Sequence, residues 1–413
     1  MSHVRLRHLV HVNPSSPAFD DLPSDAELTF LPMEKIWPDD RLDLSERRTK
    51  SSVTTGYTRF QHGDVLVPKI TPTFEASRSV LITDGLLNGT GAGTTELHIL
   101  RAGPEIDPRF LLYITHSHPF LKMGEAEMYG VAGQKRVPDE FIRNFTINLL
   151  TLDEQRRIVE YLDAETARIS LMERLQHTLL DKLNERDQAF IDRELDRLES
   201  RHGVRRFKWA IRRIEQGFSP QCHNIPADRD RWGVLKVSSV KNGRFWPEEN
   251  KQLPDTIAPD QRFEVRPGDL LITRANTPSL VGAAAVVPEI REKLLLCDKI
   301  YRITLTPELD PHFVVLASRG SKIRNLCAAA SHGTSQSMAN LKTDEVKEWP
   351  IPNIDIQGQR LAIKRVADQQ AATNALRGKI YRQLELLKER RRALITAAVT
   401  GQFDVATASR TTD

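Results

Sequence analysis

The chain has 413 residues, with 59 Lys and Arg against 55 Asp and Glu, a formal net charge of +4, and 39% hydrophobic residues. This length predicts roughly two to four domains, and the mild positive charge permits nucleic-acid binding without requiring it. Three widely spaced cysteines, Cys222, Cys297 and Cys327, argue against a zinc ribbon or a disulfide scaffold. No apolar run approaches the ~18 residues of a membrane helix and no N-terminal signal core stands out, so we expect a cytoplasmic protein without membrane contact.

The amino-acid composition of the first half of the chain changes near residue 150. Residues 1–150 are rich in Pro, Gly and Thr and contain short β-type runs, which predicts a strand-rich mixed domain with long loops. Residues 153–200 contain neither Pro nor Gly and are crowded with Glu, Arg, Leu and Asp, which predicts one long helix. Thr151 and Glu154 are spaced as a capping box, and Gly203 is the expected stop.

The same design returns at an offset of about 204 residues. Asp64-Val65-Leu66-Val67 recurs as Asp269-Leu270-Leu271-Ile272, and Asp107-Pro108 recurs as Asp310-Pro311. A second globular domain is therefore expected, followed by a second helix from about residue 357 to Gly401. A repeat this long is a duplicated module rather than a solenoid unit, and it suggests two related targets held by one chain.

Both predicted helices carry apolar residues three or four positions apart. The first offers Ile158, Leu162, Ile169, Met172, Leu179, Leu183 and Phe190, and the second Ile363, Val366, Thr373, Leu376, Ile380, Leu384, Leu387, Leu394 and Ala398. Gln370, Arg377 and Arg391 also fall on the seam. We predict an α+β fold of two globular domains, each followed by a long helix, with the helices paired as an antiparallel coiled coil of pseudo-twofold symmetry. The alternative left open is that each helix packs on its own domain or on another protein.

Four motifs resemble those of the specificity subunit of a type I restriction-modification system, and the resemblance covers nearly the whole chain. They are Thr151-Leu152-Asp153-Glu154-Gln155-Arg156-Arg157-Ile158, Lys388-Glu389-Arg390-Arg391-Arg392-Ala393-Leu394, Gly133-Gln134-Lys135-Arg136-Val137-Pro138 and Gly333-Thr334-Ser335-Gln336-Ser337-Met338. The resemblance implies target-recognition domains at residues 1–150 and 204–354, spacer helices at 151–203 and 355–402, and a tail at 403–413. The second spacer departs from the pattern, because Gly358 stands where an acidic residue is expected, which predicts a weaker cap.

The resemblance further implies a non-catalytic subunit of a restriction endonuclease and adenine methyltransferase complex that serves in phage defence. Each recognition domain would read one half of a bipartite double-stranded DNA target. The spacers would set the gap between the halves and dock two methyltransferase subunits, and two restriction subunits would join where the system has them. This chain would hold no cofactor. S-adenosylmethionine, and ATP and Mg where a motor-nuclease is present, would be bound by partner subunits.

Polar loops in both copies carry the side chains that contact phosphates and base edges. The candidate DNA-binding residues are Lys69, Thr71, Thr73, Gln134, Lys135, Arg136, Lys236, Ser238, Arg274, Asn276, Thr277, Thr334, Ser335 and Gln336. The same residues also fit ordinary loop charges, caps and turn formers. On the spacers, Leu175, Leu180, Leu376 and Ile395 are expected on exposed faces that bind partner subunits.

Catalytic motifs are missing from the sequence. There is no GxxxxGK[ST] phosphate loop and no Asn/Asp-Pro-Pro-aromatic signature of an amino-methyltransferase, and no catalytic metal site is expected. Three alternatives remain open at this point: a stand-alone DNA-binding or phage-defence scaffold without a methyltransferase, a structural cross-linker, and an enzyme that acts alone.

Overall fold

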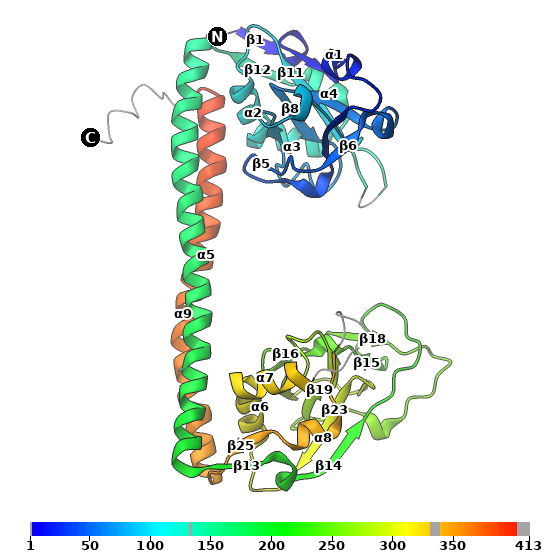
Figure 1. Ribbon diagram of the computed structural model, residues 1–413, viewed down its shortest axis with the longest axis vertical. Coiled ribbons are helices and arrows are strands. Elements are labelled where there is room, and N and C mark those ends of the chain that lie inside the picture. The colour runs from blue at the N-terminus through cyan, green and yellow to red at the C-terminus, as the bar shows by residue number, and fades with distance from the viewer. Residues whose placement is uncertain (1, 132–133, 331–338, 403–413) are drawn as a thin grey trace, which may run out of the picture. The chain divides into compact units, whose positions relative to one another are not determined.

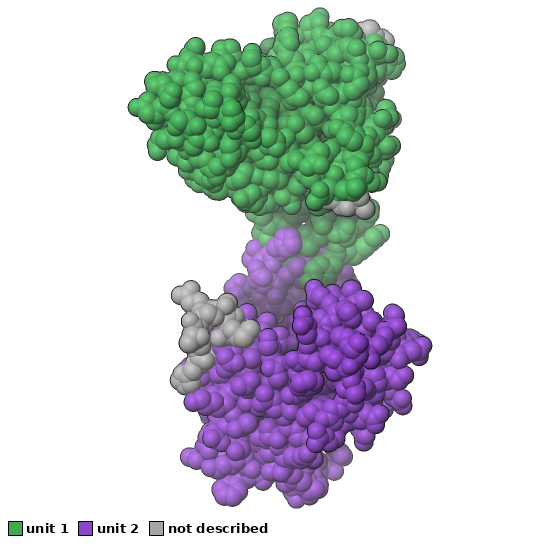
Figure 2. Space-filling view, turned by 90° about the vertical axis from the view of Figure 1, so that its right-hand side faces the viewer, with its two compact units in different colours: residues 1–176, 381–413 green, residues 177–380 purple. Residues whose placement is uncertain are grey.

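The computed structural model describes residues 2–131, 134–330 and 339–402 (Figure 1). The chain divides into two compact units, residues 1–176 with 381–413 and residues 177–380 (Figure 2). Each unit holds one strand-rich domain and a part of each of two long helices. No helix among the described residues is both long enough and apolar enough to cross a membrane.

The first long helix, α5, runs from Leu152 to His202 and contains no Pro or Gly over its 51 residues. The Thr151 N–H donates to Glu154 Oε2 at 2.8 Å and the Glu154 N–H to the Thr151 hydroxyl at 3.3 Å, which forms the predicted capping box. Gly203 ends the helix with φ of 72°, a left-handed conformation that glycine adopts without strain.

The second long helix, α9, runs from Ile356 to Val399. Asp355 caps this start, because its Oδ1 accepts the Gly358 N–H at 2.8 Å. Gly358 has no side chain to return the second bond of a capping box, so this cap is the weaker of the two, as predicted. Gly401, with φ of 73°, follows the helix as predicted.

The two helices run antiparallel within each unit. In the second unit Asp187 of α5 pairs with Arg377 of α9 at 2.9 Å, and Glu194 pairs with Arg365 at 3.5 Å. In the first unit Ile158 near the start of α5 shares a buried cluster with Ala398 near the end of α9. Residues later in α5 therefore pair with residues earlier in α9. This confirms the predicted antiparallel coiled coil.

The apolar seam differs from the prediction at two positions of α5. Ile169 and Leu183 are buried, at 2% and 4% exposed, but Met172 and Leu179 are 47% and 40% exposed. An α-helix drifts by about 20° for every seven residues relative to a strict heptad, so spacing alone does not fix which edge of the stripe is covered. Met172 and Leu179, seven residues apart, both fall on the uncovered edge.

The first domain combines two four-stranded sheets with short helices. Its sheets have the strand orders β6-β3-β10-β7 and β2-β11-β8-β9, and β1 pairs with β12 and β4 with β5. The strands are β1 (Ser2–Arg5), β2 (Val10–Val12), β3 (Glu27–Leu31), β4 (Ile36–Trp37), β5 (Arg41–Leu42), β6 (Arg47–Thr49), β7 (Thr58–Gln61), β8 (Asp64–Pro68), β9 (Val80–Leu81), β10 (Thr90–Gly93), β11 (Leu97–Ala102) and β12 (Thr146–Leu149). The helices are α1 (Pro17–Asp20), α2 (Pro108–His116), α3 (His118–Ala126) and α4 (Asp139–Asn144).

The second domain repeats the central part of this plan. Its sheets have the orders β14-β23-β19-β21 and β18-β15-β22, with the pairs β13-β25, β16-β17 and β20-β24. The strands are β13 (Val204–Arg206), β14 (Ile211–Gln216), β15 (Gly233–Leu235), β16 (Val240–Lys241), β17 (Arg244–Phe245), β18 (Asn250–Gln252), β19 (Leu270–Thr273), β20 (Ala275–Asn276), β21 (Ala284–Val286), β22 (Leu294–Leu295), β23 (Ile300–Leu305), β24 (Ala339–Asn340) and β25 (Pro350–Pro352). The helices are α6 (Pro311–Arg319), α7 (Ser321–Ala330) and α8 (Thr343–Lys347).

Equivalent elements occupy equivalent places in the two domains. The antiparallel pair β8-β11 corresponds to β19-β23, and the parallel pair β3-β10 corresponds to β15-β22. Helices α2 and α6 both begin with Pro and are capped by an Asp, Asp107 or Asp310, whose side chain accepts a backbone N–H of the first turn. The sequence repeat is thus a structural repeat.

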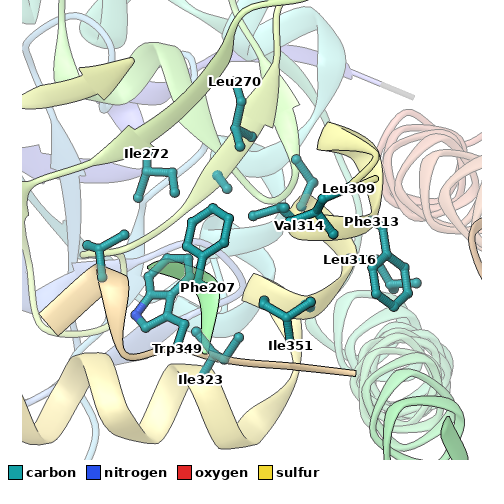
Figure 3. Packing of buried hydrophobic residues seen from close by; sticks show 14 of the residues in the cluster. Phe207, Leu270, Ile272, Leu309, Phe313, Val314, Leu316, Ile323, Trp349 and Ile351 are labelled. Atoms are coloured by element: carbon teal, nitrogen blue, oxygen red, sulfur yellow. The ribbon is translucent and has the colours of Figure 1, made fainter. Parts of the chain in front are cut away.

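The core of the second domain extends to the strand pair β13-β25, which connects the domain to the two long helices. Phe207 and Trp349 stack with ring centroids 6.1 Å apart, and both side chains are at most 1% exposed. Figure 3 shows them in the same buried cluster as Leu270 and Ile272 of β19. Because β13 and β25 flank these two rings, the base of the domain is fixed where α5 ends and α9 begins.

The predicted hairpin turn at Asn242-Gly243 lies between β16 and β17, with φ of 56° and 75°. The equivalent turn of the first domain uses Asp39 and Asp40 in the same left-handed region, with φ of 64° and 55°. Aspartate is less suited to this backbone than glycine. The carboxylates account for the choice, because Asp39 pairs with Arg391 of α9 and Asp40 with Arg109 of α2.

Candidate nucleic-acid interface

Two loops of the first domain that the sequence predicts to contact DNA lie against each other. Residues 69–73 follow β8, and residues 134–136 precede α4. The Thr71 N–H donates to the Lys135 carbonyl at 3.0 Å, and the Val137 N–H donates to the Lys69 carbonyl at 2.9 Å. Residues some 65 positions apart in the sequence are thereby joined into one polar surface.

Arg136 is held by a carboxylate in the free protein. Its guanidinium grips Glu96 in a fork, with Nη2 to Oε1 at 2.7 Å and Nε to Oε2 at 2.9 Å. The hydrogen bonds and charge of Glu96 raise the pKa of Arg136 above its usual value. Arg136 therefore orders the loop in the absence of a ligand, and its contact with DNA stays a prediction.

Lys69, Thr71 and Thr73 also make internal contacts. The Lys69 ammonium donates to the Thr95 carbonyl at 2.9 Å, and burial lowers the pKa of Lys69. The Thr73 hydroxyl donates to the Ile70 carbonyl at 2.6 Å, and the Thr71 hydroxyl to the Lys135 carbonyl at 3.4 Å. These three side chains shape the loop, whereas Gln134 and Lys135 are exposed at its surface.

Tyr129 belongs to this surface and was missed by sequence reasoning. Its N–H donates to the Arg136 carbonyl at 3.2 Å, and the Arg136 N–H donates back to the Tyr129 carbonyl at 2.9 Å. Its side chain is 64% exposed. An exposed ring beside polar loop residues can contact a thymine methyl or stack on a base. The aromatic residue just before Gly130 was the sequence signal that could have revealed it.

The second domain builds an equivalent pairing from Arg274, Asn276 and Thr277. Asn276 lies in β20, opposite Ala339 of β24, and the Leu341 N–H donates to the Arg274 carbonyl at 2.8 Å. The Asn276 Oδ1 accepts the Thr277 N–H at 2.9 Å, so this side chain shapes its own turn. β24 directly follows residues 331–338, and the candidates Thr334, Ser335 and Gln336 in that segment lie outside the described residues.

Lys236 and Ser238 lie apart from the paired loops, around the short turn between β15 and β16. Both contact Glu249: the Ser238 hydroxyl donates to Oε2 at 2.6 Å, and the Lys236 ammonium lies 3.9 Å away. Lys35 of the first domain is placed similarly, 3.4 Å from Asp43 and 3.5 Å from Glu46. A shared internal role explains these residues, and their contact with DNA stays a prediction.

The predicted partner-binding residues of the long helices divide into two kinds. Leu175 and Leu376 are 59% and 38% exposed, but Leu180 and Ile395 are only 8% and 4% exposed. The expectation of exposed faces at Leu180 and Ile395 is therefore wrong. Leu180 lies three residues before buried Leu183 on the covered face of α5, and Ile395 packs into the core of the first unit.

Other apolar side chains on the outer faces were not predicted as partner contacts. Leu171 of α5 is 49% exposed, and Tyr381 and Leu386 of α9 are 57% and 45% exposed. Their spacing alone did not distinguish them from seam residues. Within the described part of the chain, no group of three or more His, Cys, Asp or Glu side chains is arranged to hold a metal ion.

Comparisons with known proteins show which sequences this chain resembles. No protein-family model matches the sequence. The chain is 28% identical over 444 residues to the type I restriction enzyme EcoEI specificity subunit of Escherichia coli, across 84% of this chain and 74% of that protein. It is 38% identical over 187 residues to the EcoAI specificity subunit of the same organism, across 44% of this chain and 30% of that protein.

A solved structure shares the fold. It comes from work on complex assembly and conformational transition of the type I R-M system, and it aligns with a TM-score of 0.68 and 18% identity over 97% of this chain and 98% of its own. At this identity the structural likeness shows the fold alone. The duplicated domains and the antiparallel helices thus occur in a chain whose sequence is similar to two specificity subunits of type I restriction enzymes.

Proposed function

We propose that this chain is the DNA sequence-specificity subunit of a type I restriction-modification complex. Residues 1–150 and 204–354 each read one half of a bipartite double-stranded target, and residues 151–203 and 355–402 are the spacers that set the gap. The observation that carries the proposal is the duplication of one strand-rich domain with its paired polar loops, each copy joined to the same antiparallel coiled coil.

The paired loops suit direct readout. Base edges in the major groove are distinguished by side chains that donate and accept hydrogen bonds, while cations on phosphate fix the register. Gln134 and Lys135 offer both kinds of group on an exposed surface of the first domain, and Asn276 and Thr277 follow the equivalent strand of the second. The underlying strands are buried, so the loops are held on a rigid support.

The long helices are the docking surface for two methyltransferase subunits. Exposed apolar side chains such as Leu175 on α5 and Leu376 on α9 supply contacts of the kind that protein interfaces bury. Two restriction subunits join the assembly where the system has them. The chain is itself non-catalytic and acts in the cytoplasm. S-adenosylmethionine is held by the methyltransferase subunits, and ATP and Mg by a motor-nuclease.

Selection of duplexes from a randomised pool tests this function directly. The purified chain with its methyltransferase should enrich one motif made of two specified blocks separated by an unspecified gap. Gln134→Ala should weaken the preference in one block and Thr277→Ala in the other. No enrichment of any duplex, even with methyltransferase present, would contradict the role in DNA recognition.

A further inference from the structure

A buried ion pair lies in the helix seam of the second unit. Asp187 of α5 is 8% exposed, and its Oδ2 lies 2.9 Å from Nη2 of Arg377 on α9. Its Oδ1 accepts a hydrogen bond at 2.8 Å from the hydroxyl of Thr373, a side chain with no exposure. The carboxylate is thus satisfied by α9 from two directions.

A second ion pair lies in the seam of the first unit. Arg391 of α9 is 9% exposed, and its Nη2 lies 2.8 Å from Oε2 of Glu173 on α5 and 2.9 Å from the hydroxyl of Ser170. Asp39 of the hairpin turn also pairs with Arg391. Here too the charge is covered, and α5 again supplies the acid.

The sequence repeat relates these two pairs. At the offset that aligns Gln155 with Gln359, Asp187 of α5 aligns with Arg391 of α9, and Glu173 of α5 aligns with Arg377 of α9. Each copy of the helix therefore has the same two seam positions, but α5 has an acid at both and α9 has an arginine at both. Other seam positions are alike in part: Leu183 aligns with Leu387 and Ile191 with Ile395, whereas Ile169 aligns with Thr373 and Gln176 with Ile380.

Two further ion pairs between the helices have the same arrangement of charges, with the acid on α5 and the base on α9. Glu165 with Arg390 and Glu194 with Arg365 also take the acid from α5 and the base from α9. Within the described residues, four ion pairs join the two helices, and all four have this sense.

We propose that this polarity determines which helices pair: it favours α5 with α9 and excludes α5 with a second α5 and α9 with a second α9. The apolar positions that the two copies share, such as Leu183 with Leu387 and Ile191 with Ile395, cannot make this distinction. In an antiparallel pair of two α5 helices, Glu173 of one would meet Asp187 of the other. In a pair of two α9 helices, Arg377 would meet Arg391. Like charges brought together out of water strongly disfavour both assemblies.

The assembly excluded by this arrangement is one in which a second copy of the chain pairs through like helices. Duplicated helices could otherwise join two chains in this way. The rule concerns helix pairing alone and does not require DNA recognition. It leaves each α5 to pair with an α9.

Two full-length copies with different affinity tags, expressed in the same cells, test the rule. Asp187→Arg with Arg377→Glu leaves an opposite-charge pair within the chain. It also gives each helix one acid and one base at its two seam positions, so that pairs of like helices become complementary. Pulling down one tag should then recover the second copy roughly tenfold more than for the unchanged chain. Asp187→Glu with Arg377→Lys is the matched control, because it keeps the polarity and should recover no more than the unchanged chain.

Equal recovery from the charge-swapped chain and the control would overturn the proposal. Circular dichroism of each purified chain checks that the helices have formed. If the first swap fails to fold, Glu173→Arg with Arg391→Glu and Asp39→Asn produces the same pattern at the other pair, and the last change removes the carboxylate that would face the new acid. That chain should also recover its tagged copy, and a folded chain that does not would likewise refute the rule.

Discussion

The side-chain carbonyl of Gln155 accepts a hydrogen bond from the backbone N–H of Asp107 at 2.8 Å, and so ties α5 to the residue that caps α2. Its amide donates to the carbonyls of Glu105 and Leu150, both at 2.9 Å. The Gln155 side chain is fully buried. Because a glutamine amide satisfies three backbone groups at once here, it joins the domain to its helix in a way that no apolar residue can.

The first prediction concerns this joint. Gln155→Leu removes all three contacts and leaves buried backbone groups without partners, so the free energy of unfolding of the first unit should fall by about 2–4 kcal/mol. Chemical denaturation followed by circular dichroism measures the loss. Arg157→Ala, on the exposed face of the same helix turn, should change stability by less than about 0.5 kcal/mol.

Gln359 makes the equivalent contacts in the second unit, with Asp310 N–H at 2.8 Å and the carbonyls of Glu308 and Ile354 at 2.8 and 3.0 Å. Gln359→Leu should therefore destabilise to a similar extent, with the early loss of amide protection confined to residues 177–380. If hydrogen exchange shows the two variants opening the same residues first, the view that each glutamine secures its own domain is mistaken.

The second prediction concerns acid stability. His98 is 4% exposed, its Nε2 donates to the Val137 carbonyl at 2.9 Å, and burial lowers its pKa from 6.5 to about 4. The folded state therefore favours the neutral ring, and the unfolded chain binds more protons between these two pKa values. The contribution to stability is complete above pH 6.5 and is lost as the pH falls toward 4, by about 3 kcal/mol in total.

Thermal melts between pH 7 and pH 4 test this dependence. His98→Gln, which can still donate to the Val137 carbonyl, should flatten the pH profile. His116, which is partly buried and bonded to the Ser79 carbonyl, with its pKa also lowered by desolvation, continues to titrate in that variant. A profile unchanged by His98→Gln would show that His98 is not among the groups that take up protons on unfolding. Because Val137 follows the 134–136 loop, acid should also weaken binding by the first domain.

The third prediction separates loop order from DNA contact in the first domain. Lys135→Ala should reduce affinity for all sequences alike and lower the slope of log K against log salt by about one, as expected for one lost phosphate contact. Glu96→Gln keeps the shape of the acceptor but removes its charge, which should loosen Arg136 and impair discrimination in one half-site only. Fluorescence anisotropy at several salt concentrations distinguishes the two behaviours. Equal losses in both half-sites would contradict the assignment.

The fourth prediction concerns the spacers. Seven residues inserted into both helices at matching positions preserve the heptad seam and add about 10 Å to each helix. The preferred gap between the half-sites should lengthen while both halves stay the same. An unchanged gap preference would refute the idea that helix length sets the spacing. Replacing residues 204–352 with those of a relative should change one half-site only.

Much of the fold could be predicted because its signals are strong and local. The absence of Pro and Gly marks α5, Thr151 with Glu154 marks its cap, and the recurrence of Gln155 as Gln359 marks the duplication. The side of each helix that the other helix covers was harder to predict. The exposure of Met172 and Leu179 depends on where α9 lies, which spacing along one helix does not reveal.

Candidate site residues were harder to judge than elements. Sequence reasoning selected Arg136 as a DNA-binding candidate, but Glu96, which pairs with it, lies 40 positions away and is brought close only by the folded sheet. Tyr129 was missed because its pairing with Arg136 is a backbone contact that leaves no mark on composition. The role of a loop residue depends on partners distant in the sequence, whereas a helix can be predicted from the few turns of sequence that form it.

Methylome sequencing of cells that express this chain with its methyltransferase tests the central claim most directly. The account predicts one split motif, methylated on adenine in both halves, that disappears when this chain is deleted and shifts in one half when either recognition domain is exchanged. Methylation that does not depend on this chain would contradict its role as the specificity subunit.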